Sequence, residues 1–500
     1  MGRLSLSALA AGFDLRAAAA AAARDAAADL RRGEILAFAL PLAIYLASSY
    51  HDVMYWDAGE MDTVPYILGI AHPPGYPLYT LLGWVFTHLV PAGSVAFRMS
   101  ALSAIAMACA CWCIARAGGT AAALLFAFGG VVWAHATRAE PHAFVALACV
   151  AVLLFLLRWL QGGSARDLYA VAAALGLGVA VHPLVASTLP GILAAIVARA
   201  DETAPRVLRR AALIACACAA VWFLYLPLRS AYVNAQHLDP AAALGISGGA
   251  FWNYGDPALF ANWAALVTGR DVGVEGVPYG FTAHAYVLGV VHFVQVMLSE
   301  FTPAGSLLGL AGLVAMFRRD LTRALVAVLT MFPSALFAFG FGAESDVDRY
   351  FLPAFALVAI AAGTFARELR PRMKVTVTAA MAILTLYLLL SQPHFFDQPH
   401  DRRAAGEAAE VVAATPSDAI VIATWVIAPP LAYDAYVLHR TGDRTILASW
   451  YGDQIDRIPQ WSASRPVFVA GTPEGSVPGY HLERMPTHTE LYRVEKNGSQ

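Results

Sequence analysis

Long apolar blocks recur along most of this chain, and short polar segments separate them. A transmembrane helix needs about 20 predominantly apolar residues to cross about 30 Å of hydrocarbon. About eleven blocks approach this length, several of them short: 35–50, 97–115, 118–136, 142–159, 168–182, 183–199, 211–228, 301–317, 324–342, 350–366 and 373–391. The pattern therefore predicts an all-α polytopic membrane protein with about eleven transmembrane helices.

Two further apolar segments, 76–90 and 284–300, are interrupted by prolines, histidines or a glutamate. They are predicted to be juxtamembrane helices, because charge favours that placement. With both left out of the count, the basic residues of the later loops share one side: Arg116, Arg158, Arg166, Arg199, Arg206, Arg209, Arg210, Arg318, Arg319, Arg323, Arg367, Arg370, Arg372 and Lys374. The positive-inside rule makes that side cytoplasmic.

Both ends of the chain differ from this membrane region of residues 34–391. Residues 1–33 contain an alanine run, Ala17 to Ala23, flanked by arginines, which is unlike a cleavable signal and predicts a cytoplasmic amphipathic segment. Residues 392–500 contain three apolar runs separated by helix-compatible stretches, which predicts a small α/β domain outside the membrane.

Composition supports a membrane protein and weakens other classes. Hydrophobic residues make up 59% of the chain and charged residues 14%, well below the roughly 25% charge of soluble domains. A net charge of -2 offers no basic surplus for nucleic acid. The six cysteines lie in apolar tracts without the spacing of a disulfide or metal framework. We expect a multi-pass protein of the inner, cytoplasmic membrane.

The same topology sends many ionisable and polar residues to the extracytoplasmic face: Asp52, Asp57, Glu60, His72, Arg138, Glu140, His142, His182, Arg229, Asn253, Asp256, Glu344, Asp346 and Asp348. Charged groups near bilayer depth are costly and tend to line cavities. Several loops that converge on one face therefore predict a composite site. The alternative is that loops are simply polar.

The first outer loop carries the clearest candidate chemistry. Asp57 and Glu60 are three residues apart, so both carboxylates share one face if the segment is helical. One could act as general base and the other as orienter or metal ligand; the alternative is a solvated interfacial pair. His72 follows, and the Pro73-Pro74-Gly75 sequence after it predicts a fixed turn.

Three motifs of this region resemble a known family. They are WDAGE (Trp56 to Glu60), HPPGYPLY (His72 to Tyr79) and AFRMSALSA (Ala96 to Ala104). The chain resembles the protein O-mannosyltransferase-like membrane proteins of the GT-C glycosyltransferase superfamily. RAEPHAF (138–144), YLPLRS (225–230), NYGDP (253–257) and DRYFLPAF (348–355) extend the resemblance, although Pro141 and His142 depart from it. The resemblance implies that Asp57 is catalytic and that Glu60 is its partner.

A lipid-linked donor needs cations and polar groups at membrane depth for its phosphate and sugar. The candidates are His72, Arg138, Glu140, His182, Arg229, Asn253 and Asp256. Each has a structural alternative. Arg229 could anchor a helix end, Arg138 could pair with Glu140, and His182 beside Pro183 could be a cap. Asn253 and Asp256 are also ordinary turn residues.

These observations predict a GT-C-type membrane glycosyltransferase. It would move a sugar, with mannose one candidate, from a polyprenyl-phosphate-linked donor to an extracytoplasmic protein or glycan acceptor, and protein O-glycosylation is favoured. A transporter or flippase of a lipid-linked glycan is the alternative, but transporters place their sites near the midplane, whereas these charges lie at one face. The sequence assigns no cofactor and leaves a divalent metal open.

Overall fold

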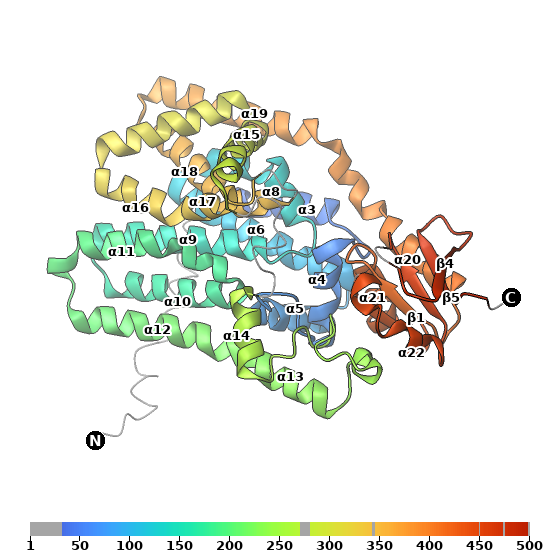
Figure 1. Ribbon diagram of the computed structural model, residues 1–500. Coiled ribbons are helices and arrows are strands. Elements are labelled where there is room, and N and C mark those ends of the chain that lie inside the picture. The colour runs from blue at the N-terminus through green and yellow to red at the C-terminus, as the bar shows by residue number, and fades with distance from the viewer. Residues whose placement is uncertain (1–32, 271–280, 343–345, 450, 474–475, 499–500) are drawn as a thin grey trace, which may run out of the picture.

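The computed structural model describes residues 33–270, 281–342, 346–449, 451–473 and 476–498 of the chain. A large helical region leads into a small sheet-containing domain at the C-terminus (Figure 1). The helices of the first region are α3 (Leu36–Ser48), α4 (Trp56–Ile67), α5 (Pro77–Leu89), α6 (Val95–Gly118), α7 (Thr120–Ala127), α8 (Gly130–Ala136), α9 (His142–Gly162), α10 (Ala165–Val181), α11 (Leu189–Ala198), α12 (Pro205–Phe223), α13 (Tyr225–Ala235), α14 (Phe260–Thr268), α15 (Ala283–Arg319), α16 (Leu321–Met331), α17 (Pro333–Phe339), α18 (Leu352–Glu368) and α19 (Pro371–Ser391).

The helical region is built to cross a membrane several times. Within the described residues, 6 helical segments are long and apolar enough to span it: Val95–Gly118, His142–Gly162, Pro205–Ala235, Ala283–Arg319, Val347–Glu368 and Pro371–Ser391. The pair formed by α16 and α17, bent by 44°, makes a further span if it is counted as one. The predicted multi-pass membrane architecture is therefore confirmed.

The remaining predicted spans correspond to shorter helices. Helix α3 has 13 residues and α10 has 17, while the blocks at 118–136 and 183–199 are each divided between two helical segments. Short helices cross a full bilayer only if neighbouring turns extend them. The number of eleven spans therefore stays a prediction.

The two interrupted segments differ in the structure. Helix α5 covers the first with 13 residues, a rise of about 20 Å that falls short of the hydrocarbon thickness. The second forms the beginning of the 37-residue helix α15, which continues through a kink at Thr302 and Pro303 into the predicted span 301–317. The sequence therefore located the break in this helix but treated its two arms as separate elements.

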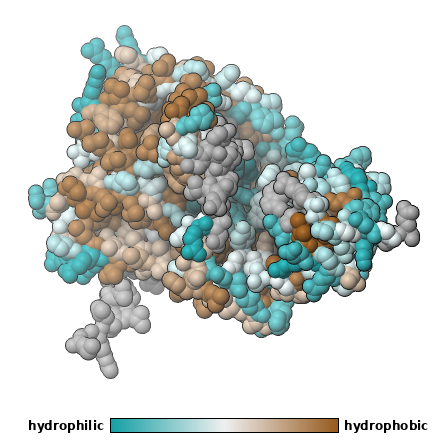
Figure 2. Space-filling model, viewed as in Figure 1, coloured by the Kyte–Doolittle hydropathy of each residue, from teal (hydrophilic) through white to brown (hydrophobic). Residues whose placement is uncertain are grey.

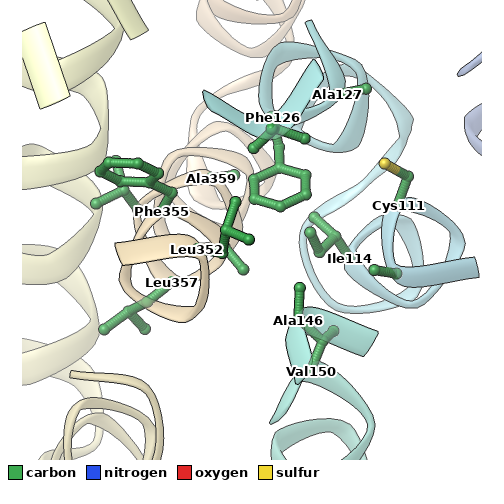
Figure 3. Close-up of a cluster of buried hydrophobic side chains, with 14 of the residues drawn as sticks. Cys111, Ile114, Phe126, Ala127, Ala146, Val150, Leu352, Phe355, Leu357 and Ala359 are labelled. Atoms are coloured by element: carbon green, nitrogen blue, oxygen red, sulfur yellow. The ribbon is translucent and has the colours of Figure 1, made fainter. Parts of the chain in front are cut away.

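Helix α18 lies at the centre of the membrane region, where its residues pack against α6, α7, α9 and α15. Figure 3 shows Leu352, Phe355 and Ala359 of α18 beside Phe126 of α7 and Ile114 of α6. Small residues allow these helices to approach closely. A Cβ added at Gly312 of α15 would lie 2.1 Å from the Ala361 carbonyl oxygen of α18.

The outer surface of the molecule divides in the same way as the fold. Hydrophobic side chains cover much of the helical region, whereas hydrophilic side chains predominate over the C-terminal domain (Figure 2). Exposed apolar residues such as Leu213 of α12, Leu310 of α15 and Ile383 of α19 contribute to the apolar surface. Such a surface is stable in contact with lipid rather than with water.

The C-terminal domain contains a mixed five-stranded sheet in the order β2-β1-β3-β5-β4. Its elements are α20 (Arg403–Ala414), β1 (Ile420–Ala423), α21 (Ala428–Tyr436), β2 (Thr445–Ala448), α22 (Ile458–Ser462), β3 (Val467–Ala470), β4 (Tyr480–Arg484) and β5 (Leu491–Lys496). β1 pairs in parallel with β2 and β3, and β5 is antiparallel to β3 and β4. All three apolar runs of the sequence form strands, β1, β2 and β3.

Candidate active site

Asp57 lies in the first turn of α4, where the helix macrodipole favours a carboxylate. Three side chains from distant parts of the chain approach it. Arg349 Nη1 lies 3.3 Å from Asp57 Oδ2, and Trp425 Nε1 donates a hydrogen bond of 2.8 Å to Oδ1. His72 Nε2 is 3.8 Å from Oδ2. The carboxylate is therefore held between two basic groups and an indole N–H.

Glu60 and Asp57 both contact His72. The Glu60 side chain is fully buried one turn after Asp57, and it accepts a hydrogen bond of 2.9 Å from the backbone N–H of His72. Its second oxygen pairs with His72 Nδ1. The opposite ring nitrogen of His72 is 2.9 Å from the hydroxyl of Tyr76. Asp57 and Glu60 therefore have different environments, although both belong to one helix.

The electrostatics of this cluster favour charged side chains. Burial alone would raise the pKa of Asp57, but His72, Arg349 and the Trp425 hydrogen bond lower it below its ordinary value. Burial would lower the pKa of His72, but the carboxylates of Glu60 and Asp57 raise it to about 9. Near neutral pH the cluster therefore holds an ionised Asp57 and a protonated His72.

Asp57 and His72 line a cavity of about 1070 Å³ whose lining contains both polar and apolar side chains. The polar lining residues also include Tyr76, His182, Tyr254, Thr268, Arg270, Arg349, Tyr350 and Trp425. The apolar lining residues include Pro183, Leu184, Val267, Phe281, Phe337 and Phe341. One occupant could therefore present a charged group and a hydrocarbon group to the same space.

A second polar cluster is linked to Arg349 through Asp346. Asp346 accepts a hydrogen bond of 2.7 Å from Arg349 at one carboxylate oxygen and one of 2.8 Å from Arg138 at the other. Arg138 is also 3.2 Å from Glu140, which pairs with His142 at 2.9 Å. Arg138 and Glu140 do not line the cavity. Hydrogen bonds through Asp346 connect Arg138 to Arg349, which does.

His182 lines the cavity and also has the capping role considered from the sequence. Its Nδ1 accepts a hydrogen bond of 3.0 Å from the Leu184 backbone N–H. In the neutral ring the proton is then on Nε2. The His182 ring lies 5.1 Å from that of His142 and 5.4 Å from that of Tyr76. The His182 side chain can therefore both cap the beginning of the 3-10 helix Pro183–Thr188 and offer one N–H donor to a ligand.

The other predicted donor-binding residues lie apart from the cavity lining. Arg229 donates to the carbonyl oxygens of Leu68 at 2.6 Å and Ile67 at 3.1 Å, so it caps the C-terminal end of α4. Asp256 accepts hydrogen bonds from Ser230, Asn234 and Asn253, which hold their loop against α13. For these residues the structure supports the anchoring and turn interpretations that the sequence left open.

No group of three or more metal-ligating side chains suited to an ion occurs among the described residues. The two oxygens of Glu60, which the sequence offered as a metal ligand, both contact His72. His142 in turn contacts Glu140. The carboxylates of the site are therefore paired with protein cations or donors.

Sequence reasoning missed Arg349 and Trp425 as site residues. Arg349 belongs to the DRYFLPAF motif, where the charged pair of Asp348 and Arg349 beside an apolar run was an available signal. Trp425 follows the first of the three apolar runs of the C-terminal region, 419–423, and had no such signal. Tyr76 and Tyr254 belong to quoted motifs and line the cavity, but neither was proposed individually.

The part of the chain that contains Asp57 also matches a known protein family. The family model for the N-terminal domain of protein O-mannosyl-transferase TMEM260 matches residues 57–117 and 113–205, a range that begins at Asp57 and includes His72, Arg138 and Glu140. The predicted family resemblance is confirmed.

Two curated relatives carry the name of this family. Protein O-mannosyl-transferase TMEM260 of Mus musculus is 24% identical over 360 residues, which cover 66% of this chain and 49% of the mouse protein. The tmem260 protein of Dictyostelium discoideum is 33% identical over 141 residues, 25% of this chain and 16% of that protein. The matches span half or less of the length of these relatives.

Among solved structures, ArnT from Cupriavidus metallidurans bound to undecaprenyl phosphate aligns with a TM-score of 0.57 at 13% sequence identity. The alignment covers 92% of this chain and 97% of the ArnT chain. At this low identity the likeness shows the fold alone, which this chain shares with ArnT.

Proposed function

We propose that this protein is a membrane glycosyltransferase that moves a sugar from a polyprenyl-phosphate-linked donor to an acceptor hydroxyl. One observation carries the proposal: an ionised carboxylate, Asp57, lies beside Arg349 and His72 in a cavity that is also lined by apolar side chains. The TMEM260 relatives favour mannose as the sugar and a protein hydroxyl as the acceptor.

The polar and the apolar side chains of the cavity lining match the two ends of such a donor. Arginine and protonated histidine are suited to a phosphate, because their N–H groups make charge-assisted hydrogen bonds. Phe337, Phe341 and Val267 offer an apolar surface to the first isoprene units. The undecaprenyl phosphate bound to the ArnT neighbour supports a polyprenyl-phosphate lipid as this ligand.

The proposed reaction uses Asp57 as the base. The acceptor oxygen bonds to C1 of the sugar as its O–H bond breaks, and the proton passes to the Asp57 carboxylate. The bond between C1 and the phosphate oxygen breaks, and its electron pair stays on the phosphate, which gains one negative charge. Arg349 and His72 stabilise that developing charge, and a positioned base contributes typically 10²- to 10⁴-fold.

The remaining candidates have supporting roles in this proposal. Glu60 keeps His72 oriented and protonated, and His182 offers its free N–H to the sugar or phosphate. Arg138, which is itself paired with Glu140, holds the Asp346 carboxylate that positions Arg349. Arg229, Asn253 and Asp256 fix α4 and the loop that carries Tyr254.

The charge asymmetry of the sequence supports an extracytoplasmic site and C-terminal domain in an inner membrane, crossed about eleven times. Labelling of engineered single cysteines in intact cells tests this orientation. A cysteine near Trp461 should react with an impermeant reagent in intact cells, whereas one in the loop 199–210 should react only after lysis. The opposite pattern would reverse the topology.

The activity is tested with purified protein in lipid vesicles and a panel of polyprenyl-phosphate sugars. We expect one donor to be consumed and an equal amount of polyprenyl phosphate to appear when an acceptor peptide with serine and threonine is present. Movement of the intact donor between leaflets without cleavage would instead identify a flippase.

A further inference from the structure

The C-terminal α/β domain docks directly on the helix that carries Asp57. Helix α21 packs against α4, and the contact is close, since a Cβ added at Gly59 would lie 2.9 Å from the Pro429 Cβ and 2.1 Å from the Met54 carbonyl oxygen. Tyr433 of α21 is buried, and its hydroxyl accepts a hydrogen bond of 3.2 Å from the Ala96 backbone N–H. The domain is therefore held in place against the first outer loop.

This docking brings Trp425 to the catalytic carboxylate. Trp425 lies two residues beyond β1, at the carboxyl end of the parallel strands, which is the edge where α/β sheets commonly place functional residues. Its indole ring stacks on Phe251 with centroids 5.8 Å apart and an interplanar angle of 6°. It also makes an edge-to-face contact with the His72 ring, with the ring centroids 6.1 Å apart. The indole therefore has one fixed orientation.

The two oxygens of Asp57 have different kinds of partner. Oδ2 is near the charged groups of Arg349 and His72, whereas Oδ1 accepts its hydrogen bond from the uncharged indole of Trp425. A donor phosphate competes with Asp57 for Arg349 and His72, because both carry positive charge. It has no comparable attraction for the indole. The Trp425 hydrogen bond is therefore the contact that persists when the donor binds.

We propose that Trp425 is a positioning residue, through which the C-terminal domain fixes the orientation of the Asp57 carboxylate during transfer. The inference rests on the proposed role of Asp57 as base. The torsion that rotates a carboxylate is soft, so an Asp57 released by Arg349 would turn among several orientations. The indole N–H selects one of them, and the free lone pair on Oδ1 then points in a constant direction toward the acceptor hydroxyl.

The substitution Trp425→Phe tests this role in the full-length protein in lipid, because it keeps the ring stacked on Phe251 and removes the N–H. We expect kcat to fall about 10- to 100-fold, the range for a hydrogen bond to a charged group. The KM for the donor should change less than about threefold, because Arg349 and His72 remain. Trp461→Phe is the matched control, because Trp461 is buried in the same domain against Ile420, Leu447 and Val467 and away from the cavity lining. This variant should keep the wild-type rate.

Two readouts distinguish positioning from general support of the fold. Loss of the N–H should raise the pKa of Asp57 and move the acidic limb of the kcat profile to higher pH, because the hydrogen bond helps to lower that pKa. Phe251→Leu removes the stacked ring and leaves the N–H, so it should not move that limb. An unchanged rate and an unchanged limb in Trp425→Phe would overturn the inference while the wild-type activity stands.

A measurement without a Trp425 variant covers the case in which Trp425→Phe does not fold. In protein labelled with ¹⁵N-tryptophan, one of the 11 indole N–H resonances should be displaced by Asp57→Asn, since the carboxylate acceptor becomes an amide. Identical indole spectra for both proteins would overturn the contact. Absence of transfer by wild-type protein with every donor would instead overturn the proposed function.

Discussion

Asp57 and Glu140 are two carboxylates with the same kinds of partner and very different access. Each lies within 3.3 Å of an arginine, Arg349 or Arg138, and each has a histidine nearby. The Asp57 side chain is 28% exposed in the cavity, whereas that of Glu140 is 3% exposed. Burial would raise the pKa of Glu140, but Arg138 and the hydrogen bond from His142 lower it well below its usual range.

The comparison shows that access, rather than the identity of the charged partners, distinguishes a candidate base from a structural ion pair. Asp346 joins the two groups, because it accepts from Arg138 and from Arg349. A substrate can reach Asp57, while Glu140 has protein on every side. Substitution should therefore affect activity at the first carboxylate and stability at the second.

The largest effect is expected for Asp57→Asn, which keeps the size of the side chain and removes its basicity. Turnover of the lipid-linked donor should fall about 10²- to 10⁴-fold, with thermal unfolding and donor binding largely retained. Asp52→Asn is the control, because Asp52 forms a surface ion pair with Arg402 at 3.3 Å outside the motif. A wild-type rate in Asp57→Asn would exclude Asp57 as the base, and joint loss of donor binding would direct attention to Glu60.

Glu140→Gln should produce the opposite result. The substitution leaves Arg138 and His142 without their shared carboxylate in a buried site, and breaking such a pair costs about 3 kcal/mol of folding free energy. Asp346 still pairs with Arg138, so a larger loss is not expected. Thermal unfolding in detergent measures the change, and kcat per folded molecule should stay within about threefold of the wild-type value. A selective loss of kcat would place Glu140 in the chemistry.

The extent to which sequence predicts this site follows from the separation of its parts. Asp57 and Glu60 are three residues apart, so their spacing indicated a common face if the segment was helical, and α4 is that helix. Their division of roles depends on His72, which belongs to the same loop and was also proposed. Arg349 and Trp425 are 292 and 368 positions from Asp57. Local patterns contain no information about such contacts, because tertiary packing creates them.

The fold shows the same contrast. Apolar block lengths predicted where helices occur, and the three apolar runs of the C-terminal region predicted β1, β2 and β3. The docking of α21 on α4 was not predictable, because it depends on the complementary shapes of Gly59 and Pro429. The sequence therefore described the C-terminal domain as separate from the site, whereas the structure brings Trp425 of this domain into the cavity lining.

A smaller effect is expected from the titration of His72. Its pKa is raised to about 9 in the folded protein, above the ordinary value of about 6.5. The stability that protonated His72 contributes is therefore complete below about pH 6.5 and is lost as pH rises through about 9. Because the same charge faces the departing phosphate, kcat should fall about tenfold over the upper part of this range.

His72→Gln tests this assignment, because glutamine keeps a hydrogen-bond donor for Glu60 without a titrating charge. The variant should be slower near neutral pH and should lack the alkaline limb of the rate profile. Its melting temperature should also vary less between pH 6.5 and 9 than that of the wild type. An alkaline limb that persists in His72→Gln would show that a group other than His72 produces it.

The smallest effect is expected for Arg229→Gln. Comparison with Arg349→Gln tests which of the two arginines binds the donor phosphate. Arg229 donates to the last carbonyls of α4 and stacks on Tyr232 at 5.1 Å, so Arg229→Gln should lose about 1 kcal/mol of stability. Its KM for the donor should stay within about twofold. Arg349→Gln, the matched substitution at the cavity wall, should raise that KM at least about tenfold, because it removes a charge-assisted contact to phosphate. Equal rises in KM for both variants would return Arg229 to the phosphate site. If neither variant raises the KM for the donor, Arg349 does not bind the phosphate. His72 would then be the principal cation beside Asp57.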